Sequence, residues 1–222
     1  MANRVLLLAC LLLVWVLSSV AAASTAATTR PRAFEASYHL SISGWPDADI
    51  LHRLTQMGVD DWRITMRARI AIARGQEAGY FRLDGDELRS VGYNASYRLL
   101  GIKRRYALDS SDLESLPDRQ SAIVALAMRA ANSSCQQGCP IHYRDHRGRN
   151  KTLVYRLLPK SPLQVAGQTL QALRLELGEP DEPDKRMVMA LHPELPGLLL
   201  EVDYYSDGKR KSRLALTSLT LY

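Results

Sequence analysis

Apolar side chains recur at every second position along much of the chain, and this alternation restricts the fold more than any other feature. The clearest segment is 62–72, and its apolar positions are Trp62, Ile64, Met66, Ala68, Ile70 and Ile72. Arg63, Thr65, Arg67 and Arg69 lie between them. A period of two places alternate side chains on opposite faces of a β-strand. A strand divided in this way is typical of an antiparallel sheet with one face in water.

Further strand-like segments follow at short intervals. They cover approximately residues 34–42, 48–57, 80–83, 88–91, 97–108, 153–157, 173–177, 187–191, 198–204 and 214–216. The segment 48–57 alternates poorly. The dipeptides Asp84-Gly85 and Asp207-Gly208 predict tight hairpin turns. The apolar phase slips by one residue between Leu216 and Leu219, which predicts a β-bulge.

One helix is expected, from about Leu116 to Ala131. Ser115 is the predicted cap, and Pro117 suits the first turn. Asp118 and Ser121 lie near the start, where the helix dipole favours a carboxylate. Strands otherwise follow strands, so we predict a mainly β fold: a strongly curved antiparallel sheet or open β-barrel of eight to eleven strands, covered by one α-helix. Such a sheet either encloses a cavity or is filled by its own side chains.

The amino terminus has the layout of a secretory signal peptide. Arg4 precedes an apolar run of ordinary signal length, and the small residues 21–23 end at a cleavage site between Ala23 and Ser24. The alternative is an uncleaved anchor, but the run is shorter than the ~20 residues that span a bilayer. We therefore predict a signal peptide at 1–23, a flexible leader at 24–33 and a single β-rich domain at 34–222, with no stable membrane span after cleavage.

The net charge and the predicted export indicate where the protein is located and which partners it can meet. Cleavage removes Arg4 and no acidic residue, so the formal net charge falls from +6 to +5. The densest basic segments, 103–105 and 209–211, are interpreted as solvated surface, with contact to anionic lipid, lipopolysaccharide or peptidoglycan as the alternative. Export predicts a periplasmic location and argues against a nucleic-acid partner.

Two cysteines, Cys135 and Cys139, remain after cleavage. In an oxidising compartment they are predicted to form a disulfide that pins the turn after the helix. A zinc site that also uses His142 and His146 is one alternative, although only two residues separate the cysteine and histidine pairs. A redox-active pair is another, although the spacing is C-x-x-x-C and not C-x-x-C.

Catalytic motifs do not stand out. The chain has no G-x-S-x-G turn, no glycine-rich phosphate loop and no H-E-x-x-H motif. Its five histidines are scattered, and Trp45 and Trp62 are interpreted as core residues, with a ligand cavity as the alternative. We therefore expect no catalytic, cofactor-binding or metal-binding residue.

The order of these features resembles the bacterial exported proteins grouped as domain of unknown function 3108. The similarity covers about residues 34–221. It consists of the Phe34–Ser41 strand followed by Gly44, the Trp62–Ile72 strand, the Asp118-Arg-Gln-Ser121 helix start, and Leu195-Pro196, Glu201-Val202 and Asp207-Gly208. The resemblance implies a periplasmic, mainly antiparallel β protein, and it implies no activity.

Three interpretations of function follow. The first is a non-catalytic periplasmic protein whose curved sheet holds a lipid-like or other apolar or amphipathic ligand. The alternative is a protein-interaction module that binds another protein of a cell-envelope assembly. A hydrolase-type enzyme is a third and weaker interpretation, because no acid–base pair stands out.

Overall fold

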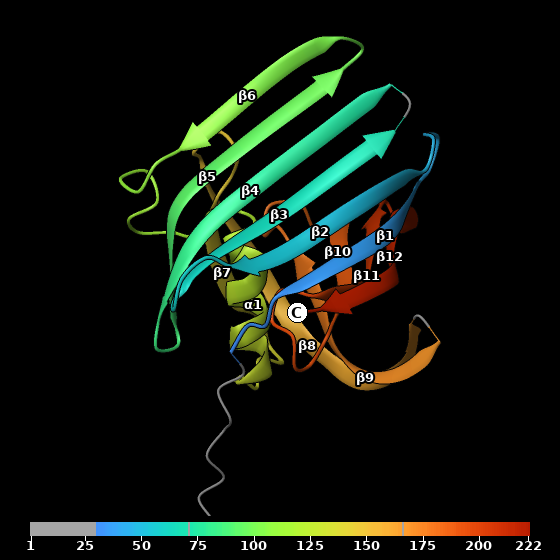
Figure 1. Cartoon of the computed structure of the whole chain (residues 1–222). Coiled ribbons are helices and arrows are strands. Elements are labelled where there is room, and N and C mark those ends of the chain that lie inside the picture. Colours follow the sequence, from blue (N-terminus) through green and yellow to red (C-terminus); the bar gives the residue numbers. More distant parts are fainter. Residues whose placement is uncertain (1–29, 71, 166) are drawn as a thin grey trace, which may run out of the picture.

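Twelve antiparallel strands form one open, curved sheet in the computed structural model, which describes residues 30–70, 72–165 and 167–222 (Figure 1). The described residues contain a single α-helix, α1 (Ser121–Ala131), which lies in the hollow of the sheet. The predicted mainly β fold, with a curved antiparallel sheet and one covering helix, is confirmed. Within the described residues the sheet does not close into a barrel, because β6 and β7 form its two free edges.

The sheet consists of two six-stranded meanders that meet at its centre. The first meander comprises β1 (Phe34–Ile42), β2 (Ala48–Gln56), β3 (Asp61–Ile70), β4 (Ala73–Asp84), β5 (Glu87–Leu99) and β6 (Ile102–Leu108). The second comprises β7 (Cys139–Arg144), β8 (Asn150–Val165), β9 (Gln168–Gly178), β10 (Lys185–Leu191), β11 (Leu199–Ser206) and β12 (Lys209–Leu221). Helix α1 connects the two outer edges, and β1 pairs with β12 at the centre.

Two of the predicted local features are confirmed by the register. Ser206 pairs with Lys209, and the two residues between them have positive φ angles of 53° for Asp207 and 70° for Gly208. Positive φ at both central positions is the geometry that matches the twist of a two-residue hairpin. The predicted bulge lies at Thr217, because Ser37 pairs with Ser218 while Tyr38 pairs with Leu216.

Other boundaries differ from the predictions. Asp84 pairs with Glu87, so the β4–β5 turn is centred on Gly85 and Asp86, one residue later than predicted. The segment 97–108 divides into the end of β5 and all of β6. Ile72, predicted on the apolar face of a strand, lies in the β3–β4 turn and is 43% exposed. Strand β7 was not predicted, and it begins with Cys139 and Pro140, which fits an edge strand.

The helix begins later than predicted and Ser115 does not cap it. Asp118 Oδ1 accepts the backbone N–H groups of Gln120 and Ser121 at 2.8 and 3.0 Å. The Asp118 carbonyl accepts the N–H of Ala122 at 2.8 Å. A carboxylate that binds the first free N–H groups is the usual N-terminal cap of a helix. The prediction that Asp118 lies at the start of the helix is therefore confirmed, and its carboxylate also binds the first N–H groups directly.

No helix among the described residues has the length and hydropathy needed to cross a membrane. The predicted signal peptide and the cleavage site between Ala23 and Ser24 lie outside the described residues, as does most of the predicted leader. These assignments remain predictions.

Candidate functional site

The hollow between α1 and the sheet is not completely filled, and it contains a cavity of about 490 Å³. Fourteen of the nineteen lining residues are apolar. They are Leu40, Ile50, Met66, Ala122, Ile123, Leu126, Ile141, Leu153, Leu177, Met187, Met189, Leu199, Val202 and Leu214. The cavity lies in the size range of small-molecule sites, about 300–1,000 Å³, and has their mainly apolar lining.

The strand register explains why apolar side chains meet there. Met189 pairs with Val202, Val202 with Leu214 and Leu214 with Leu40, so one row of apolar side chains crosses four strands. Side chains at paired positions share a face of the sheet. Leu40 and Val202 are only half-buried, although they belong to the concave face. Apolar surface therefore remains accessible inside the fold.

Five polar residues complete the lining: Arg119, Gln120, Tyr143, Tyr204 and Ser212. Gln120 is only 4% exposed. Its Nε2 donates to Glu77 Oε2 at 2.7 Å, whereas its Oε1 is buried with no hydrogen-bond partner among the described residues. The Glu77 contact fixes the orientation of the amide, because a carboxylate accepts only from the NH₂ group. Gln120 thus lines the cavity and carries a buried acceptor that the described residues leave unpaired.

Glu77 organises the other polar groups beside this wall. Its carboxylate accepts the hydroxyls of Tyr93 at 3.0 Å and Tyr97 at 2.6 Å. The Nε atom of Arg119 lies 3.4 Å from Glu77 Oε2. Burial and the neighbouring Glu77 raise the pKa of Tyr97 to about 12, so its hydroxyl keeps the proton that it donates. The network holds Gln120 in place and leaves Arg119 at the cavity wall.

A second polar cluster, around Asp118, lies next to this network but does not line the cavity. Asp118 is fully buried, and its Oδ2 accepts the hydroxyls of Ser90 at 2.9 Å and Ser121 at 2.6 Å. A Cβ atom at Gly79 would lie 2.6 Å from Asp118 Oδ1, so only glycine fits there. Burial raises the pKa of Asp118. With all of its bonds made to the helix start and to β5, this carboxylate has a structural function.

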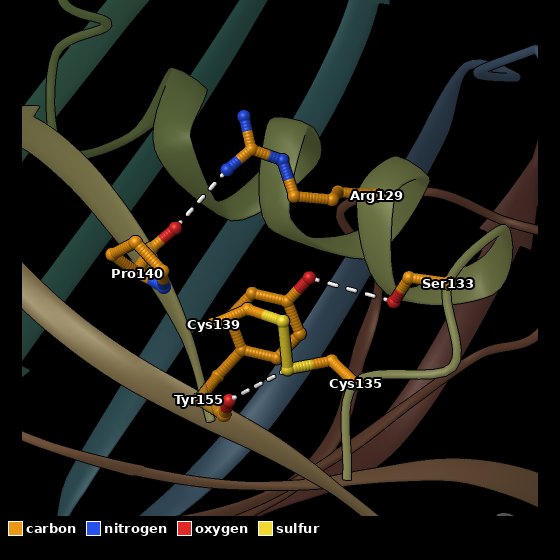
Figure 2. The surroundings of a disulfide bond; sticks show 6 residues. All are labelled: Arg129, Ser133, Cys135, Cys139, Pro140 and Tyr155. Carbon is orange, nitrogen blue, oxygen red and sulfur yellow. Dashed lines mark hydrogen bonds between the residues drawn. A yellow bond between two sulfur atoms is a disulfide. The ribbon is translucent and has the colours of Figure 1, made fainter. Parts of the chain in front are cut away.

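The two cysteines lie together where the chain leaves α1 and enters β7 (Figure 2). The structure pairs Cys135 with Cys139 in a disulfide, with 6.0 Å between their Cα atoms, a distance that suits such a bond. The carbonyl of Cys135 accepts the N–H of Leu157 at 2.6 Å, which joins the helix exit to β8. Arg129 Nη1 donates to the carbonyl of Pro140 at 3.1 Å beside the pair.

We expect the protein to carry this disulfide when it is isolated without reductant. Its denatured mass should be two hydrogens below that of the reduced protein, and reduction should lower the free energy of unfolding by about 2 kcal/mol in the chain-entropy model. Cys135→Ala with Cys139→Ala provides the matched control, because reductant should leave its stability unchanged. Identical masses with and without reductant would contradict the expectation.

The structure does not support the zinc alternative. His142 Nδ1 lies 2.8 Å from Thr152 Oγ1. The ring of His146 packs edge-on against Tyr106 and Tyr97, with 4.8 and 5.7 Å between ring centroids. In the described ranges no group of three or more His, Cys, Asp or Glu side chains could hold a metal ion.

Sequence reasoning did not find the residues of the cavity. Trp62 is a core residue and Trp45 is 53% exposed, and neither lines the cavity. The alternation of apolar and polar residues was the signal that could have identified the cavity residues. Met187, Met189 and Val202, for example, occupy inward positions of their strands and line the cavity. Gln120 lies in the Asp118–Ser121 segment, but the orientation of its amide depends on Glu77, which is 43 residues away.

Comparison with known proteins gives no family assignment. No family model matches the chain, and no curated protein matches it. The resemblance to domain of unknown function 3108 therefore stays a prediction.

Several solved structures match the chain at low sequence identity. The MucA/MucB complex of Pseudomonas aeruginosa matches at 18% identity and a TM-score of 0.41, covering 88% of this chain and 53% of that chain. A putative outer membrane lipoprotein-sorting protein domain from Vibrio parahaemolyticus matches at 8% identity and a TM-score of 0.31, covering 86% and 85%. A DUF1329 family protein from Desulfovibrio piger matches at 14% identity and 0.30, covering 88% and 87%. The chain thus spans about half of the MucB chain, and similarity at this level does not identify a ligand or a partner.

Proposed function

We propose that this protein is an exported, non-catalytic binding protein that holds an apolar chain in the hollow between α1 and the sheet. The observation that carries the proposal is an apolar cavity of about 490 Å³ that Gln120 helps to line, and the Oε1 atom of this residue is buried without a hydrogen-bond partner among the described residues. Apolar lining favours a hydrocarbon body. A buried acceptor without a partner is costly, so it favours a ligand with a hydrogen-bond donor.

The ligand class that fits is therefore a single-chain amphiphile with a hydroxyl or amide N–H group near the end of its chain. Met66, Met187 and Met189 line the cavity, and methionine side chains adapt to apolar chains of different shape. Arg119 lies at the same wall, and a guanidinium has five N–H donors, so it can contact an anionic or strongly polar head group in addition to Glu77, which lies 3.4 Å from its Nε.

Binding is tested by displacement of the fluorescent probe N-phenyl-1-naphthylamine from the purified protein. We expect Ile123→Trp, which fills the cavity from α1, to weaken binding of the probe at least tenfold, or about 1.4 kcal/mol. Val91→Trp is the matched control, because Val91 is 45% exposed and lies outside the cavity. Equal probe binding by both variants and the unchanged protein would disprove the cavity as the site.

The proposed hydrogen bond from the ligand to Gln120 Oε1 is tested with two compounds of similar length that compete with the fluorescent probe. These compounds are 1-dodecanol and 1-methoxyundecane. Only the alcohol can donate to Gln120 Oε1. We expect Gln120→Leu to reduce the affinity for the alcohol about tenfold and to leave the ether unaffected, because the lost contact is one buried hydrogen bond. Equal loss for the two competitors would remove Gln120 from the site.

The alternative, a protein-interaction module that uses a sheet edge, has less support. Strand β6 carries Lys103, Arg104 and Arg105 on one free edge, and β7 carries Pro140 on the other. Charged residues and proline on edge strands discourage the addition of another strand.

A further inference from the structure

Four cationic side chains lie side by side across strands β3, β4, β5 and β6. In the register Arg69 pairs with Arg74, Arg74 with Arg98 and Arg98 with Lys103. All four residues are exposed. They lie on the face away from the cavity, because Met66 and Ala68 alternate with the arginines on β3 and Met66 lines the cavity. We call this row the cationic ladder.

The described residues do not neutralise the cationic ladder through ion pairs. None of its members forms an ion pair within residues 30–70, 72–165 and 167–222. The remaining residues contain no Asp or Glu. Asp49 pairs with Arg69 in the register, but its side chain is 98% exposed and its ionic contact is with His39, at 4.0 Å. Like charges at directly opposite positions destabilise a sheet, so the row is expected to meet an external anion.

The surface around the ladder is hollowed and carries more positive charge. Arg67 and the four ladder residues line a groove of about 720 Å³, and Asp49 is the one acidic residue among the residues that line it. Arg105 belongs to the same face, because Arg67 pairs with Gln76, Gln76 with Ser96 and Ser96 with Arg105. Several closely spaced cations match several closely spaced phosphates better than they match a single carboxylate.

Exposed apolar side chains lie at the end of the same strands. The apolar tip comprises Ile72, Leu99, Leu100 and Ile102, which are 43%, 47%, 72% and 68% exposed. It spans two adjacent turns, because the Leu100 N–H donates to the Ile72 carbonyl at 3.1 Å. The Leu99–Ile102 pair directly follows the Arg98–Lys103 pair in the register. The β3–β4 and β5–β6 turns lie at the same end of the sheet in Figure 1.

Leu100 has an unusual backbone. Its φ is +48°, in the left-handed region that glycine and asparagine adopt much more readily. Leu100 and Gly101 are the two central residues of the β5–β6 turn, and Gly101 has a φ of +86°. A leucine at the first of these positions therefore has a conformational cost and also exposes apolar surface to water. Non-glycine residues held in such conformations often have a function, and exposed apolar contact is the function that a leucine can supply.

From the ladder and the tip together we infer that this end of β3–β6 docks on the surface of an anionic phospholipid bilayer. The ladder contacts lipid phosphates, and the apolar tip enters the boundary between head groups and acyl chains. A nucleic acid would use the ladder but would leave the tip in water, so the tip favours the bilayer. This surface is separate from the cavity, and its function does not depend on a ligand there.

The test is flotation of the purified protein with vesicles. We expect binding to vesicles of phosphatidylethanolamine and phosphatidylglycerol and about tenfold weaker binding to phosphatidylcholine vesicles, with a decrease as salt rises. Arg74→Gln with Arg98→Gln should weaken binding to the anionic vesicles about tenfold. Lys209→Gln with Lys211→Gln, at the start of β12, removes the same charge and should have a much smaller effect.

The tip is tested separately with Leu100→Ser. This variant should bind vesicles about tenfold more weakly, because it loses the free energy gained when the leucine side chain moves from water into the bilayer. Val59→Ser is its control, since Val59 is 83% exposed in the β2–β3 turn. Equal binding to neutral and anionic vesicles, or no effect of either ladder or tip variants, would overturn the inference. Retention on a single-stranded DNA oligonucleotide without vesicle binding would also overturn it. Ile123→Trp should bind vesicles normally, so this inference and the proposed function can fail independently.

Discussion

Replacement of Asp118 with alanine is expected to lower the free energy of unfolding by about 3 kcal/mol. The substitution removes the helix cap, which alone contributes about 1 kcal/mol. It also leaves the hydroxyls of Ser90 and Ser121 and two backbone N–H groups without their acceptor in a fully buried place, and buried unpaired donors cost about 1–3 kcal/mol each before relaxation. Urea unfolding at neutral pH, followed by circular dichroism, measures the loss.

Asp109 provides a closely matched control. It accepts the hydroxyl of Ser111 at 2.6 Å and the backbone N–H groups of Ser111 and Asp112 at 2.9 and 3.2 Å, but it is exposed. Asp109→Ala should cost less than about 1 kcal/mol, because water can replace the lost acceptor. Asp118→Asn, which keeps an acceptor at the position of Oδ1, should fall between the two alanine variants. Equal losses for Asp118→Ala and Asp109→Ala would show that burial of the cluster contributes nothing.

Stability is also expected to fall on mild acidification because of His52. This residue is fully buried beside Phe34 and Tyr38, and burial lowers its pKa to about 4. In the unfolded chain the imidazole has a pKa of about 6.5. Between these values the unfolded state binds more protons than the folded state, so stability is full above pH 6.5 and decreases as the pH falls. The His52 contribution to this loss is about 2 kcal/mol at pH 5 and about 3 kcal/mol at pH 4.

The measurement is the free energy of unfolding in urea at several pH values for the unchanged protein and for His52→Gln. In the variant, the free energy of unfolding should no longer show the decrease at low pH that is due to His52, whatever the stability of the variant at neutral pH. His39→Gln is the control: His39 is exposed and contacts Asp47, and this variant should retain the loss. Titration of the His52 ring by NMR gives the pKa directly. A midpoint near 6.5 would contradict the expected burial effect.

His52 also explains why one strand was difficult to recognise. Ala48, Ile50, His52 and Leu54 form the buried face of β2. A histidine at one of these inward positions weakens the apolar alternation, so the segment 48–57 alternates poorly although it is a regular strand. The core accepts the ring because it stays neutral and lies within reach of the Tyr38 hydroxyl, 3.4 Å from Nδ1. The sequence around His52 does not reveal this contact, because Tyr38 lies on the neighbouring strand, 14 residues away.

The start of the helix illustrates the same limit. Ser115 and Pro117 satisfy the local preferences for a cap and a first turn, but the Pro117 carbonyl instead accepts the N–H of Arg144 on β7. The helix then begins where Asp118 can be buried against Ser90 on β5. Tertiary contacts therefore determine the boundary against a plausible local signal.

Local signals in the sequence were enough to predict the class of fold, the face that most side chains occupy and the turn at Asp207-Gly208. Alternation of apolar residues, the Asp207-Gly208 dipeptide and the phase slip before Leu219 are local signals, because strand pleat and turn geometry involve only neighbouring residues. Three features depend on the tertiary structure: α1 leaves a cavity in the hollow of the sheet, Gln120 contacts Glu77, and one row of cations crosses four strands. That row consists of Arg69, Arg74, Arg98 and Lys103. Curvature, helix position and strand register depend on contacts between residues far apart in the chain, and a period of two contains no information about them.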